Sequence, residues 1–124
     1  MPPPCEVLVV DDDEAIRSTV CDLLELEGYA VGAAVNGREA LTEVERHCPR
    51  LVVLDMQMPV MDGWGFARTI KERGIAVRIL VLTAAVNPRH RASEIKADGW
   101  IAKPFDIDQF LTEVARLYRA PVTS

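Results

Sequence analysis

The sequence lacks long apolar runs and is poor in cysteine. Its longest apolar stretches, Leu51–Leu54 and Ile79–Val86, are far shorter than the roughly 18 residues that suggest a membrane span. The three cysteines, Cys5, Cys21 and Cys48, form no C-x-x-C pair, which argues against a zinc site and against a disulfide framework. We therefore expect no membrane insertion, and reduced, mostly buried thiols.

A concentrated block of positive charge is also missing. The 14 Lys and Arg residues are outnumbered by 19 Asp and Glu residues, which leaves a formal net charge of -5. Such a chain repels a polyphosphate backbone, so we expect no direct binding of nucleic acid. Residues 1–4 have neither the basic start nor the apolar segment of a secretion signal, and a cytoplasmic protein is expected.

The length of 124 residues suits one domain with a single core. We expect a flexible N-terminal arm at residues 1–4, one domain over residues 5–119 and a tail at residues 120–124. Within the domain, β-rich runs alternate with segments of helical periodicity, the pattern of βα units around a parallel sheet with helices on both faces. The predicted strands are Glu6–Val10, Ala30–Ala34, Leu51–Leu54, Val77–Leu82 and Trp100–Ala102.

Four helices are predicted from apolar residues three and four positions apart. The first carries Ile16, Val20, Leu23 and Leu24 and stops at Gly28; the second starts at Asn36, carries Ala40, Leu41, Val44 and Cys48, and ends before Pro49; the third runs from about Gly63 to Gly74 with Phe66, Ala67 and Ile70 inward; the last starts at Asp106 with Ile107, Phe110, Leu111, Val114 and Tyr118 as its apolar stripe. The segment Asn87–Asp98 has few residues that suit a core, so we expect a short or mobile fourth helix there.

Polar side chains follow four of the predicted strands. They are Asp11 and Asp12 after the first, Asp55 after the third, Thr83 after the fourth and Lys103 after the fifth. In an open parallel sheet, ligands bind beyond the carboxyl ends of the strands. We therefore expect these five side chains to meet in one crevice.

Three carboxylates brought together repel one another unless a cation lies among them. Magnesium, a hard ion that prefers oxygen ligands, is the natural cation for Asp11, Asp12 and Asp55, with manganese as the alternative. An Asp beside such an ion can act as a nucleophile toward phosphorus. Asp13, by contrast, is expected only to favour the start of the following helix.

These motifs resemble the response-regulator receiver family of two-component signalling systems. The resemblance covers Glu6 to about Tyr118 and rests on Val9-Val10-Asp11-Asp12, on Leu54-Asp55-Met56-Gln57-Met58-Pro59-Val60-Met61-Asp62-Gly63, on Leu82-Thr83-Ala84 and on Lys103-Pro104-Phe105. It implies a flavodoxin-like, three-layer fold with strand order 2-1-3-4-5. The chain departs from the family pattern between Thr83 and Trp100, where it is slightly short and Lys96 replaces a frequent glycine.

The resemblance also implies a role for each site residue. Asp55 is the phosphoacceptor, and Asp11, Asp12, Asp55 and the backbone carbonyl of Gln57 hold the metal. Thr83 and Lys103 sense the phosphate, Trp100 is the switch aromatic or else a static edge residue, and the bond before Pro104 is cis. The implied partners are a sensor histidine kinase or histidine phosphotransfer protein and an unknown downstream protein, with homodimerisation left open.

Two other functions compete with this interpretation. An unphosphorylated pseudo-receiver would use the same fold only for interaction. A phosphatase of the haloacid-dehalogenase kind would also form an aspartyl phosphate, but that family requires Asp-x-Asp after its first strand, and here the residue two positions after Asp55 is Gln57. We therefore expect a signalling phosphoacceptor rather than an enzyme acting on other substrates.

Overall fold

The computed structural model of the chain describes residues 5–84 and 87–119, apart from the side chain of Pro88. The expected arm at residues 1–4 and tail at residues 120–124 lie outside the described residues. Strands and helices alternate along the chain. In order they are β1 (Val7–Val10), α1 (Glu14–Leu26), β2 (Val31–Ala34), α2 (Gly37–His47), β3 (Leu51–Leu54), α3 (Gly63–Glu72), β4 (Arg78–Thr83), α4 (Pro88–Glu94), β5 (Gly99–Ala102) and α5 (Ile107–Arg119).

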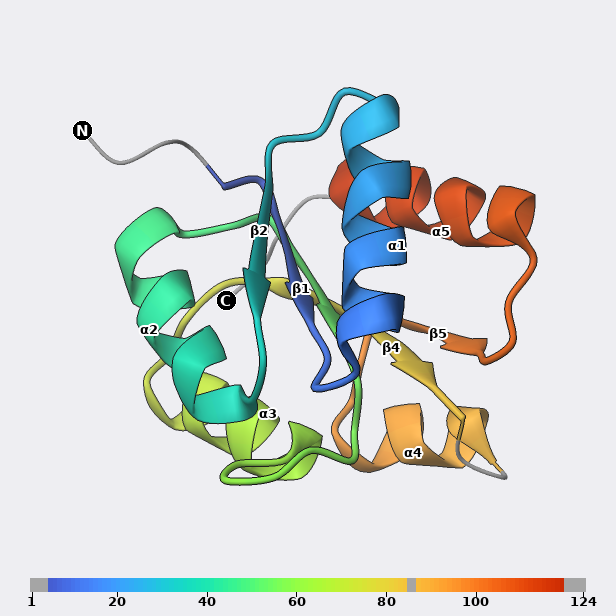
Figure 1. Ribbon diagram of the computed structural model, residues 1–124. Coiled ribbons are helices and arrows are strands. Elements are labelled where there is room, and N and C mark those ends of the chain that lie inside the picture. Colours follow the sequence, from blue (N-terminus) through green and yellow to red (C-terminus); the bar gives the residue numbers. More distant parts are fainter. Residues whose placement is uncertain (1–4, 85–86, 120–124) are drawn as a thin grey trace.

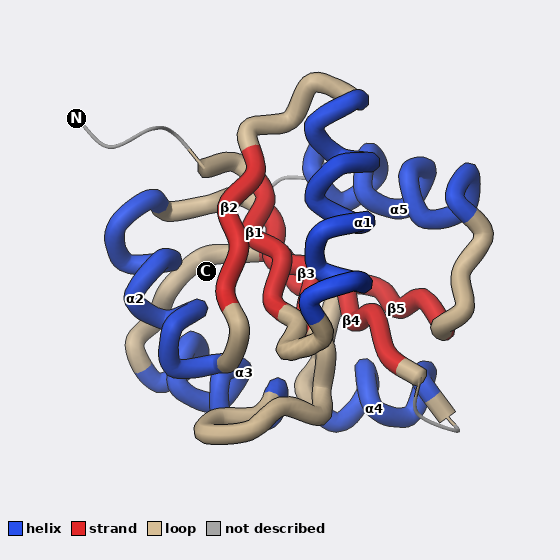
Figure 2. The backbone as a smooth tube through the Cα atoms, viewed as in Figure 1, coloured by secondary structure: helices blue, strands red, loops and turns tan. Residues whose placement is uncertain are grey.

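The five strands form one parallel sheet of order β2-β1-β3-β4-β5. This confirms the predicted strand order and the flavodoxin-like fold. Every residue of β1 and β3 is buried, because helices cover both faces of these central strands. In Figure 2 the sheet runs through the middle of the molecule with helices on either side.

The helices divide between the two faces of the sheet. Helices α1 and α5 cover one face, and α2, α3 and α4 cover the other (Figure 1). Alternate residues of each strand point to opposite faces, so each face has its own apolar core. The first core includes Val9, Val20, Leu24, Phe110 and Val114, and the second includes Leu8, Val44, Leu54, Phe66 and Ile70.

Predicted helix boundaries are confirmed by the capping contacts. The Asn36 side chain accepts a hydrogen bond from the Glu39 amide at 2.8 Å, which starts α2. Asp106 accepts from the Gln109 amide at 2.9 Å, which starts α5. A side-chain oxygen in this position satisfies an amide that the helix itself leaves unpaired.

Two predicted core residues are exposed. Cys48 follows the last residue of α2 with a left-handed φ of 48°, so it leaves the helical period and faces solvent. Ile107 is 50% exposed because the buried stripe of α5 begins one turn later, at Phe110. The buried stripe also includes Leu117, which is not among the predicted residues. The expectation that the thiols are mostly buried is also wrong in part, since Cys5 is buried, Cys21 half-buried and Cys48 exposed.

The fourth helix is short, as predicted. Helix α4 has 7 residues, and Ala92 is its only buried apolar residue among those with described side chains. Its mobility stays a prediction. Within residues 5–84 and 87–119, no helix combines the length and the apolar character of a membrane-spanning segment.

Candidate functional site

Two central strands bring the acidic residues together at the carboxyl end of the sheet. Val10 of β1 lies beside Leu54 of β3 in the parallel register, so the next residues, Asp11 and Asp55, are also neighbours. The Asp55 amide donates to the Val10 carbonyl oxygen at 3.0 Å. The predicted cluster of three carboxylates is therefore a direct result of strand pairing.

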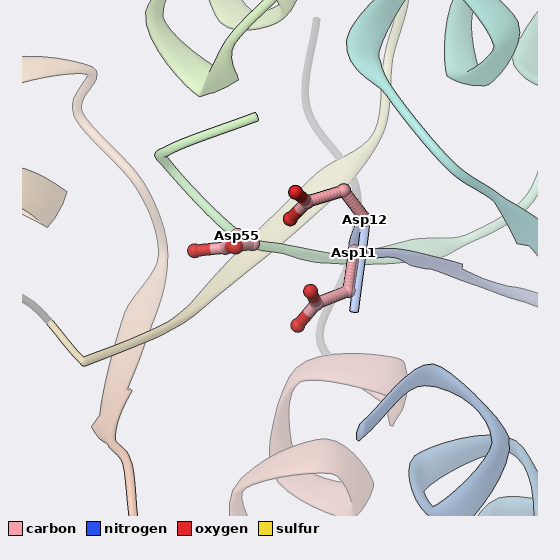
Figure 3. Close-up of side chains that lie close together, drawn as sticks. All are labelled: Asp11, Asp12 and Asp55. Atoms are coloured by element: carbon pink, nitrogen blue, oxygen red, sulfur yellow. The ribbon is translucent and has the colours of Figure 1, made fainter. Parts of the chain in front are cut away.

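Asp11, Asp12 and Asp55 each offer a carboxylate oxygen, and these oxygens lie within 4.8 Å of one another. In Figure 3 all three side chains converge on the same space, Asp11 and Asp12 from the end of β1 and Asp55 from the end of β3. Asp11 and Asp55 are buried, with 2% and 8% exposure, whereas Asp12 is exposed. The cluster is therefore open to solvent on one side.

Lys103 supplies positive charge to the cluster. Its Nζ lies 2.7 Å from Asp11 Oδ2 and 3.8 Å from Asp55 Oδ2. The Lys103 amide donates to the Thr83 carbonyl oxygen at 2.9 Å, which carries the parallel pairing of β4 and β5 up to the site. The Lys103–Pro104 peptide bond is cis, as the resemblance implies.

Burial raises the pKa of Asp55, and the negative charge of Asp11 raises it further. Lys103 and the amides of Gln57 and Met56 act in the opposite direction, because they stabilise the ionised carboxylate. Burial outweighs them. An additional positive charge nearby would therefore stabilise the ionised form of the Asp55 carboxylate.

The remaining predicted residues are Thr83 and Gln57, at this end of the sheet, and Trp100, which pairs with Val81 farther back along the strands. Thr83 is the last residue of β4 and is buried. Trp100 lies on the neighbouring edge strand, β5, and is 43% exposed. The side chain of Gln57 is exposed in the loop after β3.

Two supporting residues were missed by the sequence analysis. The guanidinium of Arg17 in α1 donates from Nη1 to the Asp11 carbonyl oxygen at 2.9 Å, and so holds the backbone of the acidic loop. At Gly63 an added Cβ would lie 2.9 Å from Met56 Cα and 3.0 Å from the Asp55 carbonyl oxygen. A glycine is therefore required for α3 to start this close to Asp55. The Asp-Gly sequence signals a turn, but nothing in the sequence gives the distance.

A site with oxygen ligands, local negative charge and an open side binds Mg²⁺ in preference to softer metals. The donor set of Asp11, Asp12 and Asp55 thus fits a hard divalent cation. Asp13 has the expected structural role, because its side chain accepts from the Ile16 amide at 3.1 Å and caps α1.

Residues 7–115 match the sequence model of the response regulator receiver domain. The chain belongs to this family. A receiver is a signalling phosphoacceptor, so the phosphatase alternative is set aside. The acidic cluster described above is typical of the magnesium site of receivers.

Named relatives of this receiver include the response regulator MprA of Mycolicibacterium vanbaalenii. The two are 39% identical over 118 residues, which are 94% of this chain and 51% of the relative. MprA of Mycobacterium leprae is 38% identical over 115 residues, or 91% of this chain and 50% of the relative. The chain thus spans about half the length of these relatives.

Solved receivers have the same fold. The response regulator TrrA of Thermotoga maritima, solved in complex with Mg²⁺ and BeF, superposes with a TM-score of 0.82 and 34% identity, covering 91% of this chain and 98% of that one. The chemotaxis protein CheY4 of Vibrio cholerae gives a TM-score of 0.82 and 32% identity over 92% and 98% of the two chains.

Proposed function

We propose that Asp55 accepts a phosphoryl group from a sensor histidine kinase or a histidine phosphotransfer protein, and that the phosphorylated receiver then binds a downstream protein. The observation that carries this proposal is the buried Asp55 carboxylate beside Asp11, Asp12 and Lys103. In the transfer, an Asp55 oxygen forms a bond to phosphorus. The bond from phosphorus to the donor imidazole nitrogen breaks, and its electron pair stays on that nitrogen.

The residues of this chain have separate tasks in the transfer. Asp11, Asp12, Asp55 and the Gln57 carbonyl would hold Mg²⁺, or Mn²⁺ in its place. When bound, the metal supplies positive charge that offsets the carboxylates and the phosphoryl oxygens. Lys103 already lies between Asp11 and Asp55, where its ammonium group would neutralise a phosphoryl oxygen as charge develops.

The signal would leave the site through Thr83 and Trp100. The phosphoryl group on Asp55 carries about 1.5 to 2 negative charges, which replace the single charge of the free carboxylate, and the Thr83 hydroxyl can donate a hydrogen bond to one of its oxygens. Thr83 pairs with Ala102 in the sheet register, two residues after Trp100. A small movement at Thr83 would thereby change the packing around Trp100, which has room to turn because it is 43% exposed.

Intact mass spectrometry tests the chemistry directly. The receiver is incubated with acetyl phosphate and Mg²⁺, with EDTA and with an Asp55→Asn variant as controls. Asp22→Asn is the matched control, because Asp22 is an exposed acid on α1, away from the cluster.

We expect a gain of one phosphoryl group in the wild type and in Asp22→Asn, and none in Asp55→Asn or with EDTA. A gain in Asp55→Asn of the same size would refute Asp55 as the acceptor. If no sample gained mass, the unphosphorylated pseudo-receiver would take the place of this proposal.

A further inference from the structure

A hollow lined by residues of α3 and by residues at the end of α4 lies on the face of the sheet that α2, α3 and α4 cover. Figure 1 shows the position of these two helices. Its volume is about 620 Å³, inside the range of about 300–1,000 Å³ that small-molecule sites have. Its interior is apolar. Ala67 and Ile70 of α3, Ile79 of β4, and Ile75 and Ile95 of the adjoining loops form its walls. We call it the α3–α4 cleft.

The rim of the α3–α4 cleft is basic. Arg68 and Lys71 of α3 and Lys96, just after α4, line it and are exposed. Within the described residues, none of these three makes an ion pair with a carboxylate. Three unpaired cations gathered on a protein with a formal net charge of -5 create a local field that attracts anions.

Among the described residues that line the cleft, Glu94 is the only acid, and its carboxylate already contacts other side chains. Its carboxylate accepts from the indole N–H of Trp64 and from Arg91 Nη1 at 2.7 Å, and it lies 3.1 Å from His90 Nε2. The Arg91 guanidinium also lies over the Trp64 ring, 5.7 Å from its centroid. Glu94 therefore does not neutralise Arg68, Lys71 or Lys96, and Trp64 is held in place as a wall of the cleft.

From this arrangement we propose that the α3–α4 cleft binds a small apolar carboxylate, an aromatic or acyl group with one anionic head. The apolar group would lie against the isoleucines, and the head would meet the basic rim. Arg68 suits a carboxylate in particular, because a guanidinium pairs with both carboxylate oxygens at once. This proposal does not depend on phosphorylation of Asp55.

A protein partner fits this surface less well than a small ligand. Protein interfaces have an apolar centre that a partner covers. The large apolar side chains exposed in the described part of the chain are Leu26, Val35, Val60, Trp100 and Ile107, and none of them lines the cleft. The apolar surface here is recessed, so a small molecule can reach it.

Amide chemical-shift mapping on the full chain tests the proposal. The probes are 2-naphthoate and octanoate, each compared with its uncharged amide. We expect saturable shifts in residues 64–75 and 94–96 and a carboxylate affinity about tenfold above that of the amide, since a tenfold ratio needs only the sum of a few weak charge contacts.

Charge reversal gives the second arm of the experiment. Lys71→Glu should lower the affinity for 2-naphthoate about tenfold, because it replaces an attraction by a repulsion. Arg38→Glu is the matched control, an exposed basic residue on α2 outside the cleft, and it should leave the affinity unchanged. The amide spectra and the thermal transitions of both variants verify that they fold.

Three outcomes would overturn the proposal. One is the absence of binding by both carboxylates up to their solubility limit. Another is equal affinity for carboxylate and amide. The third is a set of shifts centred elsewhere, for example on the face formed by α4, β5 and α5.

Discussion

The two ends of the sheet handle charge in opposite ways. At the carboxyl end, within the described part of the chain, Lys103 is the one cation that forms ion pairs with the carboxylates of Asp11, Asp12 and Asp55. At the amino end, Glu6 accepts from the Tyr118 hydroxyl and from the Ala30 amide at 3.0 Å. The carboxyl end therefore holds surplus negative charge, whereas at the amino end each oxygen of the Glu6 carboxylate accepts a hydrogen bond.

The amino end is a closed set of contacts between distant parts of the chain. Arg50 donates from Nε to the Tyr118 carbonyl oxygen at 3.0 Å, and its guanidinium lies 5.2 Å from the centroid of the Tyr118 ring. Tyr29 meets Tyr118 edge-on, with ring centroids 5.0 Å apart. These contacts join α5 to the starts of β1, β2 and β3. The comparison indicates that the amino end stabilises the fold, whereas the carboxyl end gives up stability for a reactive site.

The largest predicted effect is that of a metal at the carboxyl end. At a Mg²⁺ concentration about one hundred times the dissociation constant, the free energy of unfolding should rise by about 2.7 kcal/mol. Urea unfolding with Mg²⁺ and with EDTA measures the difference. It should disappear in Asp12→Asn combined with Asp55→Asn and persist in Asp22→Asn, and an equal rise in the double variant would place the metal elsewhere.

A smaller gain is expected when one carboxylate of the cluster is neutralised. In EDTA, Asp55→Asn should be more stable than the wild type by about 0.5–2 kcal/mol, the gain that a single charge-optimising substitution commonly gives. Lys103 keeps its partner in this variant, because its shorter contact is with Asp11. A loss of stability would show that Asp55 is better compensated than its surroundings indicate.

The pH dependence checks the cause of this gain. Burial raises the pKa of Asp55 in the fold, so the native state binds protons more readily than the unfolded state. Its penalty is complete above the folded pKa and disappears as the pH falls toward the unfolded pKa, about 3.9. The advantage of Asp55→Asn should shrink over that window, and an advantage independent of pH would contradict a charge effect.

Removal of a hydroxyl at the amino end should lower the stability of the fold, whereas Asp55→Asn should raise it. Tyr118→Phe should lower the free energy of unfolding by about 0.5–1 kcal/mol, less than a fully buried bond because water reaches this cluster. The Tyr118 hydroxyl is the first cause of the lowered pKa of Glu6. The contribution is therefore present above the unfolded pKa of Glu6, about 4.3, and is lost as the pH falls through the folded value.

Tyr29→Phe is the matched control for this variant. Tyr29 contacts the same cluster through its ring, and its hydroxyl makes no hydrogen bond to a protein group in the part of the chain that the structure describes. Its removal should leave the stability nearly unchanged. Equal losses in the two variants would mean that ring packing, and not the bond to Glu6, stabilises the amino end.

The two ends also differ in how far the sequence predicts them. The acidic residues directly follow apolar strands, and parallel strands end at one edge, so local pattern and topology together place Asp11, Asp12, Asp55 and Lys103 in one crevice. The contact between Glu6 and Tyr118 spans 112 positions. No local sequence pattern indicates that Glu6 and Tyr118 are in contact, and the pattern around Tyr118 predicts only that it belongs to an apolar stripe.

The helices show the same limit. Apolar periodicity predicts the inward faces of α1, α2 and α3, but it does not show at which residue a helix stops packing on the sheet. The predictions that Cys48 and Ile107 are buried are wrong for this reason. The hydrogen bond from Trp64 to Glu94 joins α3 to α4, and no pattern in either segment predicts that these two side chains meet. A polar contact between the surfaces of two elements depends on their relative placement, and one sequence does not contain that placement directly.

The smallest predicted effect concerns backbone strain beside the acidic cluster. Val60, in the loop between β3 and α3, has a left-handed φ of 70° and is 75% exposed. For a β-branched residue this conformation costs about 1–2 kcal/mol, while glycine adopts it freely. Glycine also loses about 0.5–1 kcal/mol more backbone entropy on folding, so Val60→Gly should raise the free energy of unfolding by only about 0.5 kcal/mol.

Val35→Gly is the control for this last variant. Val35 is also a partly exposed valine near the carboxyl end, at 37%, but it has no positive φ. Val35→Gly should lower the free energy of unfolding, because at this position no release of backbone strain offsets the entropy cost of glycine. Chemical unfolding in EDTA compares the two variants with the wild type. If both variants lost stability equally, the left-handed conformation of Val60 would carry no measurable strain, and any destabilisation of the carboxyl end would come from its surplus charge.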